Sequence, residues 1–146
     1  MDGSCTKYFT WFFDQTMPKI SGYSMDFRDY ICGEGGVLDK WMSLGVAGWR
    51  LDAAENLSDD FLDAVFRKVD GNGGVTMGEV TFEATSVPHD GTLRDMISRG
   101  YMHSTTGYPI HYAIRQFLSR DFSAREFSEF VLQIRENYPP EQFYSE

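Results

Sequence analysis

The sequence predicts an α/β protein built around a parallel sheet. Short apolar runs alternate with segments of helical periodicity along most of the 146 residues, and residues 45–61 contain the clearest such switch. Parallel strands need crossover connections of a dozen or more residues, usually helices, so this alternation favours parallel pairing. A chain of this length is the size of one domain, and we expect residues 1–146 to form a single one.

The composition argues against several classes of protein. The net charge of −9 disfavours nucleic-acid binding, because phosphate contacts need clustered Lys and Arg. No apolar run approaches the roughly 20 residues that span a bilayer, and a signal-peptide pattern is absent. Cys5 and Cys32 are too isolated for a disulfide framework or a zinc site. We therefore expect a cytoplasmic protein with no metal or other cofactor and no contact with nucleic acid or membrane.

The first half of the chain contains the best-defined elements. Residues 1–30 are predicted to be an irregular, aromatic-rich segment. A glycine turn then precedes a short helix over 37–44, and residues 46–52 (VAGWRLD) follow as a strand. Ser58 is the predicted N-cap of the next helix. The apolar side chains of that helix share one face: Phe61, Leu62, Val65, Phe66 and Val69.

The second half repeats the alternation. A glycine-rich turn leads into a second strand over 75–80 (VTMGEV), helical signals resume around 93–98, and residues 101–106 (YMHSTT) are predicted as a third strand. Pro109 suits the first turn of a further helix, since its missing N–H is not needed there. A capping box predicts that the last helix begins near Ser123, with Glu126 three positions on.

Charged side chains stand at the ends of the first two predicted strands. Side chains two apart in a strand share a face, so Arg50 lies beside Asp52 and opposite Trp49 and Leu51. A neighbouring guanidinium lowers the pKa of a carboxyl group and keeps it ionised. Glu79 occupies the corresponding place on the second strand. Both carboxylates are thus expected at the sheet edge that carries active sites in α/β folds.

Two carboxylates in different surroundings can divide the work of an acid and a base. Glycoside hydrolysis needs that division, with carboxyl groups about 5 to 5.5 Å apart when one of them attacks the sugar. Asp52 suits the nucleophile, and Glu79 suits the acid. On spacing alone, the alternative is that Arg50 and Asp52 form a structural ion pair at a strand end.

Longer stretches of sequence carry a family resemblance. Residues 45–65 (GVAGWRLDAAENLSDDFLDAV) resemble the fourth strand and following helix of the α-amylase family of glycoside hydrolases, particularly the neopullulanase, cyclomaltodextrinase and maltogenic amylase group. Residues 78–80 (GEV) are similar to the fifth-strand motif of that family. Residues 27–42 and 134–145 also resemble that group, so the resemblance covers nearly the whole chain. It implies a partial (β/α)8 TIM barrel that contains about the middle strands and helices.

The resemblance also implies a role for individual residues. Asp52 is similar to the family nucleophile, Arg50 to the arginine that orients it, and Glu79 to the general acid/base. A retaining, two-step hydrolysis of α-glucosidic bonds would follow, with maltooligosaccharides, cyclodextrins or pullulan as substrates. The expected partner is therefore an α-glucan oligosaccharide. Four further positions are implied in substrate binding: Glu55, Asn56, His103 and Tyr108.

Some positions depart from the family pattern. Thr81 stands where members usually carry Trp, and His103 and Gly107 replace an Asp and an Asn of the sixth-strand region. The early Asp and Asn-His motif and the seventh-strand His-Asp motif of the family are absent from this sequence. We therefore expect an incomplete catalytic domain. Its open strand edges would pair with a complementary barrel half or with another copy of the chain.

Two other functions remain open at this point. One is a catalytically inactive carbohydrate-binding or interaction fragment. The other is a calcium-binding module, because residues 70–79 (DGNGGVTMGE) match the later positions of an EF-hand loop. Lys68 stands at the first position of that loop, where a carboxylate should bind the ion. A glycine-rich turn between helix and strand accounts for the same residues.

Overall fold

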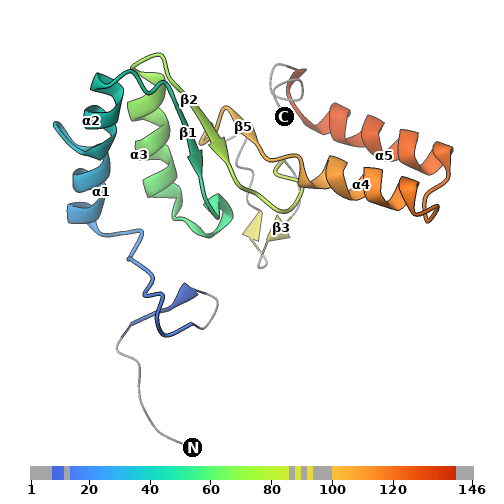
Figure 1. Cartoon of the computed structure of the whole chain (residues 1–146), viewed down its shortest axis with the longest axis horizontal. Coiled ribbons are helices and arrows are strands. Elements are labelled where there is room, and N and C mark those ends of the chain that lie inside the picture. The colour runs from blue at the N-terminus through green and yellow to red at the C-terminus, as the bar shows by residue number, and fades with distance from the viewer. Residues whose placement is uncertain (1–7, 12–13, 86–87, 90–91, 94–99, 141–146) are drawn as a thin grey trace, which may run out of the picture.

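The computed structural model describes residues 8–11, 14–85, 88–89, 92–93 and 100–140 of the chain. These residues form an α/β fold, as the alternation of helical and strand patterns predicts. Figure 1 shows the strands in the middle, between two groups of helices. Within the described residues, no helix has the length and apolar character needed to cross a bilayer.

The sheet contains three parallel strands. In spatial order they are β1 (Gly48–Leu51), β2 (Val75–Gly78) and β5 (Ser104–Thr105). The parallel pairing predicted from the sequence is confirmed, although each strand is shorter than predicted. β3 (Pro88–His89) and β4 (Thr92–Leu93) pair separately and antiparallel. β1 and β5 are the two edge strands of the three-stranded sheet.

The helices form two groups. On the β1 side lie α1 (Met25–Cys32), α2 (Val37–Ser43) and α3 (Asp59–Asp70), where α3 packs on β2 and α1 packs on both other helices. On the β5 side, α4 (Tyr108–Leu118) and α5 (Ala124–Asn137) pack against each other (Figure 1). The connection from β1 to β2 therefore passes through α3, as a parallel crossover requires.

The predicted helix starts are confirmed at three positions. The Ser58 side chain accepts a hydrogen bond from the Phe61 N–H at the start of α3. Ser123 and Glu126 form the expected capping box at the start of α5. Pro109 lies in the first turn of α4. The two serine caps satisfy backbone N–H groups that the first turn of a helix leaves without a partner.

Two predictions of secondary structure were wrong. Residues 25–30 belong to α1 rather than to an irregular segment, because Ser24 caps the helix by accepting from the Phe27 N–H. The ring of Phe27 stacks on Phe61 of α3 at 5.5 Å, which anchors α1 to the core. Leu93, predicted to be helical, is part of β4. The rest of that predicted helix, residues 94–98, lies outside the described residues.

The core lies on one face of the sheet. Thr76 and Gly78 of β2 are buried, whereas Val75 is 57% exposed and Met77 is 39% exposed. Trp49 and Leu51 of β1 pack against the cluster of apolar side chains that α2 and α3 supply: Leu38, Phe61, Val65 and Val69. The other face of the strands therefore remains open in this structure.

Candidate active site

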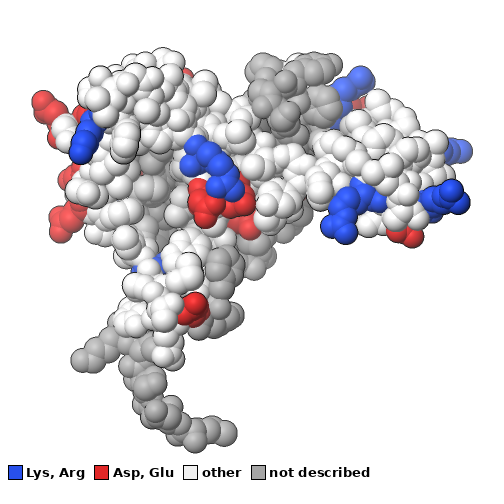
Figure 2. Space-filling model, in the orientation of Figure 1, with Lys and Arg blue, Asp and Glu red and all other residues white. Residues whose placement is uncertain are grey.

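The strand register brings the predicted carboxylates to the same edge. Arg50 pairs with Met77 and Leu51 with Gly78, so the next residues along the two strands are Asp52 and Glu79. The Glu79 N–H donates to the Leu51 carbonyl at 2.8 Å, which continues the pairing one step past the strand. Figure 2 shows basic and acidic side chains meeting in the middle of the displayed face, over the ends of the parallel strands.

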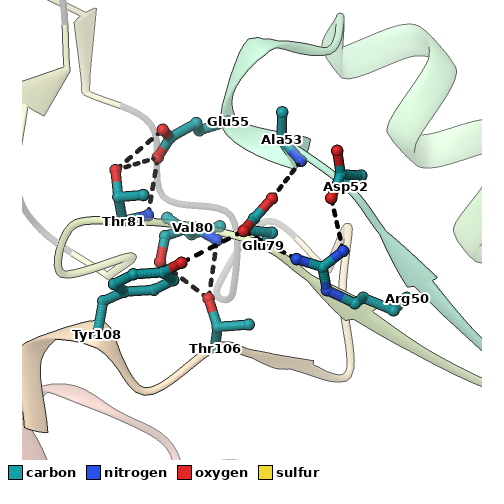
Figure 3. Close-up of polar contacts among 9 residues, drawn as sticks. All are labelled: Arg50, Asp52, Ala53, Glu55, Glu79, Val80, Thr81, Thr106 and Tyr108. Carbon is teal, nitrogen blue, oxygen red and sulfur yellow. Dashed lines mark hydrogen bonds and ion pairs between the residues drawn. The ribbon is translucent and has the colours of Figure 1, made fainter. Parts of the chain in front are cut away.

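Arg50 contacts both carboxylates (Figure 3). Its Nη1 lies 2.5 Å from Asp52 Oδ1, and its Nη2 lies 2.8 Å from Glu79 Oε1. The two carboxyl groups therefore lie within the span of a single guanidinium. The shared face of Arg50 and Asp52, predicted from the strand alternation, is confirmed. Arg50 therefore does not form only the isolated ion pair with Asp52 that was considered above, because it also binds Glu79 of the neighbouring strand.

Glu79 is held by two further donors. Its Oε2 accepts the backbone N–H of Ala53 at 2.9 Å, and its Oε1 lies 3.3 Å from the hydroxyl of Tyr108 (Figure 3). The Glu79 side chain is 21% exposed, whereas that of Asp52 is 80% exposed. Glu79 is thus fixed at the edge of the sheet, whereas Asp52 faces solvent.

The Arg50 guanidinium also sets the charge of Asp52. Its hydrogen bond holds the pKa of the Asp52 carboxyl below the ordinary value, and a hydrogen-bonding interaction with Glu79 acts in the same direction. Partial desolvation opposes both effects. In the same way, the hydrogen bond to Asp52 is the main reason that the pKa of Arg50 is raised. The Asp52 carboxyl group is therefore held in its ionised form.

Ala53 has an unusual backbone conformation. Its φ of 44° and ψ of 42° place it in the left-handed region, which costs a residue with a Cβ about 1 to 2 kcal/mol. This conformation turns the chain from β1 into the short 3₁₀ helix Ala54–Asn56 and directs the Ala53 N–H at Glu79. Such strain is typical of sites where the surrounding structure must fix one geometry.

The Glu55 side chain is held by hydrogen bonds within the protein. Its carboxylate accepts the Thr81 N–H at 2.8 Å and the Thr81 hydroxyl at 2.9 Å (Figure 3). It therefore joins the segment after β1 to the segment after β2. Asn56 ends the 3₁₀ helix, and its N–H donates to the Ala53 carbonyl. Of the four residues implied in substrate binding, Tyr108 contacts a catalytic candidate, because its hydroxyl lies 3.3 Å from Glu79 Oε1.

His103 lies directly before β5, beside Thr76 of β2. Its Nδ1 accepts the N–H of Thr76 at 3.0 Å, and its Nε2 lies 3.3 Å from Asp70 at the end of α3. Thr76 precedes Glu79 by three residues, roughly 10 Å of strand. His103 thus lies toward the opposite end of the strands, where its ring also packs at 4.8 Å from Phe66. This third strand is two residues long, and the sequence does not fix its register.

Two contributors to this edge were not identified from the sequence. Ala53 acts through a backbone N–H, which has no residue signature. Thr106 accepts the Val80 N–H and donates to the Val80 carbonyl, both at 3.1 Å, and so fixes the chain directly after Glu79 (Figure 3). A threonine at the end of the predicted third strand was the only available signal for that second contact.

The residues proposed for an EF-hand loop have other contacts. Asp70 lies against His103, and the Asn72 side chain donates to the Lys68 carbonyl at 2.7 Å. Gly73 has a φ of 73° in a tight turn that leads into β2. In the part of the chain that the structure describes, no group of three His, Cys, Asp or Glu side chains could hold a metal ion.

No family model matches the chain, and no curated protein matches it. The function is therefore argued from the carboxylate pair, its guanidinium and the fold that positions them.

Proposed function

We propose that the chain is the central part of a (β/α)8 barrel of the α-amylase type. Three observations support this: the strands are parallel, neighbours in space follow chain order, and α3 forms the crossover between the first two. β1 and β5 are open edges, and we propose that they pair with a complementary barrel half or with another copy of the chain.

The proposed reaction is the hydrolysis of α-glucosidic bonds with retention of configuration. Asp52 attacks the anomeric carbon and forms a C–O bond while the bond to the leaving sugar breaks and Glu79 protonates the leaving oxygen. Glu79 then takes a proton from water, and the water oxygen displaces Asp52 from the anomeric carbon. Atoms and protons balance, and both carboxyl groups return to their starting states.

The shared guanidinium is the observation that carries this proposal. Arg50 keeps Asp52 ionised and fixes it beside Glu79, and retaining hydrolysis requires two neighbouring carboxyl groups of different exposure. The donors around Glu79 suit its role as a base in the second step. For the first step Glu79 must take up a proton and release one oxygen to the sugar, so the contact with Tyr108 must open.

A rate measurement on matched variants tests the proposed function. We expect the purified chain, alone or mixed with a complementary barrel half, to release reducing sugar from maltohexaose, cyclodextrins or pullulan. Asp52→Asn and Glu79→Gln are expected to lower that rate by at least about 100-fold. Arg125→Ala, a surface change on α5, is the matched control and should keep the rate. Equal rates in wild type and both carboxylate variants, or no release from any substrate, would refute the hydrolase.

A second candidate function is carbohydrate binding without turnover. It is favoured by one observation, namely that both oxygens of Glu79 already accept hydrogen bonds from the protein. In that case the chain would bind maltohexaose in calorimetry but release no reducing sugar. Asp52→Asn would then change the affinity only modestly, because no transition state would be stabilised.

A further inference from the structure

A hollow next to Tyr108 has no role in the hydrolysis described above. It has a volume of about 600 Å³ and lies between the segment after β2 and the paired helices α4 and α5. Ring and proline surfaces form one part of its lining, contributed by Phe82, Tyr108, Pro109, Tyr112 and Phe130. A volume of this order is within the range of small-ligand sites.

Tyr108 joins this hollow to the carboxylate pair. Its ring lines the hollow while its hydroxyl lies 3.3 Å from Glu79 Oε1. Thr81 lines it as well and is fixed by Glu55. A ligand that occupies the pair and extends over Tyr108 therefore reaches the hollow.

The ring of Tyr112 is held in place. It lies edge-on to Phe122 at 6.0 Å and tilted to Phe130 at 6.2 Å, yet the residue is 49% exposed. A ring fixed by its neighbours and open on another side offers a preformed flat surface, which lowers the entropy lost on binding. On α4, Tyr108 and Tyr112 are four residues apart and so lie on the same helix face.

Polar groups line the remainder of the hollow. His111, Arg115 and Gln116 come from α4, and Glu83 comes from the segment after β2. The formal charges of Arg115 and Glu83 cancel, which favours a neutral ligand over an anion. Flat apolar surfaces combined with hydrogen-bonding groups and no net charge are suited to sugar units, which present C–H faces and hydroxyl edges.

We propose that this hollow, the α4 subsite, binds further sugar units of the same oligosaccharide whose bond lies between Asp52 and Glu79. The inference rests on the proposed function for its ligand class. Tyr112 forms the stacking surface, and Arg115 and Gln116 hydrogen-bond to hydroxyl groups. The subsite thus makes the chain selective for longer substrates over single glucosides.

Binding measurements on an inactive background test the α4 subsite. In Asp52→Asn protein, Tyr112→Ala is expected to weaken maltohexaose binding about tenfold, as for the loss of one aromatic contact. Binding of methyl α-glucoside, which spans only the carboxylate pair, should stay unchanged. Tyr112→Phe keeps the ring and should keep the affinity for maltohexaose. NMR titration gives both affinities and reports whether amides of residues 108–116 shift.

A second variant guards against loss of folding. Arg115→Ala alters an exposed position and should weaken maltohexaose binding at least about tenfold, as expected for one hydrogen bond to a charged group. Arg125→Ala, on the surface of α5 and outside the hollow, is the matched control and should bind as before. Unchanged maltohexaose affinity in both Tyr112→Ala and Arg115→Ala, or no binding at all, overturns the α4 subsite.

The rate of aryl α-glucoside hydrolysis by the unsubstituted chain separates the two proposals. If the chain hydrolyses the aryl glucoside while Tyr112→Ala and Arg115→Ala bind maltohexaose normally, the α4 subsite is overturned and the proposed hydrolase is retained. Absence of hydrolysis combined with weakened maltohexaose binding in both variants refutes the hydrolase and supports the α4 subsite as a carbohydrate-binding site.

Discussion

Arg50 binds Asp52 through Nη1 and Glu79 through Nη2, so one guanidinium holds the carboxylates that follow two neighbouring strands. The three side chains come from the exposed face of the sheet, whose other face is covered by the core. Because the strands are parallel and in register, their carboxyl ends meet at this edge without any long loop to position them.

The first prediction concerns the charge of Asp52. Arg50→Gln removes the main cause of the lowered Asp52 pKa, so that pKa should rise toward its ordinary value of 3.8. Titration of side-chain carboxyl signals by NMR measures this directly. Asp39 serves as the internal control, because a hydrogen bond from Lys68 lowers its pKa and Arg50 takes no part in that. An Asp52 pKa that does not move would contradict the assigned cause.

The lowered pKa of Asp52 also makes the free energy of unfolding depend on pH. The folded Asp52 pKa is depressed, so on acidification the unfolded chain takes up this proton before the folded chain does. The stabilising contribution is therefore complete above the ordinary pKa of 3.8 and is lost as pH falls through the lower folded value. Wild type and Arg50→Gln should differ in urea midpoint at neutral pH and converge in acid. A constant difference across that range would argue against Asp52 as its source.

The second prediction concerns the backbone at Ala53. Ala53→Gly relieves a left-handed conformation that costs about 1 to 2 kcal/mol with a Cβ, offset by about 0.5 to 1 kcal/mol of chain entropy. We expect the free energy of unfolding to rise by up to about 1 kcal/mol. Ala54→Gly is the matched control. Ala54 is fully buried, so the loss of its methyl group should lower the free energy of unfolding by about 1 kcal/mol. Equal destabilisation by both changes would exclude stored strain at Ala53.

The third prediction concerns the tie between Glu55 and Thr81. Thr81→Val removes a hydroxyl that donates to Glu55 and should lower the free energy of unfolding by about 0.5 to 1 kcal/mol. A double-mutant cycle with Glu55→Gln isolates the pair, and chemical denaturation measures each corner. Additive effects of the two changes would mean that the carboxylate does not join the two segments in solution.

The fourth prediction assigns His103 a structural role. His103→Phe retains a ring beside Phe66 but leaves the buried Thr76 N–H without its acceptor, so stability should fall by about 1 to 3 kcal/mol. Because His103 lies away from the carboxylate pair, the affinity of the folded variant for methyl α-glucoside should not change. His111→Phe, at an exposed position, is the control for thermal unfolding. A loss of sugar affinity without a loss of stability would return His103 to the site.

Local rules account for the part of the structure that the sequence predicts. The side-chain alternation of a strand places Arg50 with Asp52, and side-chain caps at Ser58 and Ser123 fix where α3 and α5 begin. The position of Glu79 follows from its place after an apolar run. These features depend on neighbours within a few residues, which is why a single sequence was enough to predict them.

The features that the sequence did not predict depend on tertiary context. α1 is short, and its stability depends on the stacking of Phe27 against Phe61, which lies 34 residues further along the chain. The contact between Ala53 and Glu79 uses a backbone donor, and the location of His103 follows from the register of a strand of two residues. None of these has a sequence signature of its own.

Covalent trapping tests the central claim most directly. A slow fluorinated α-glucosyl fluoride forms the glycosyl intermediate of a retaining hydrolase faster than water removes it, so the intermediate accumulates. Peptide mapping by mass spectrometry should then find one glucosyl unit on Asp52, and none in Asp52→Asn. Sugar release without any adduct, or an adduct on another residue, would contradict the assignment of Asp52 as nucleophile.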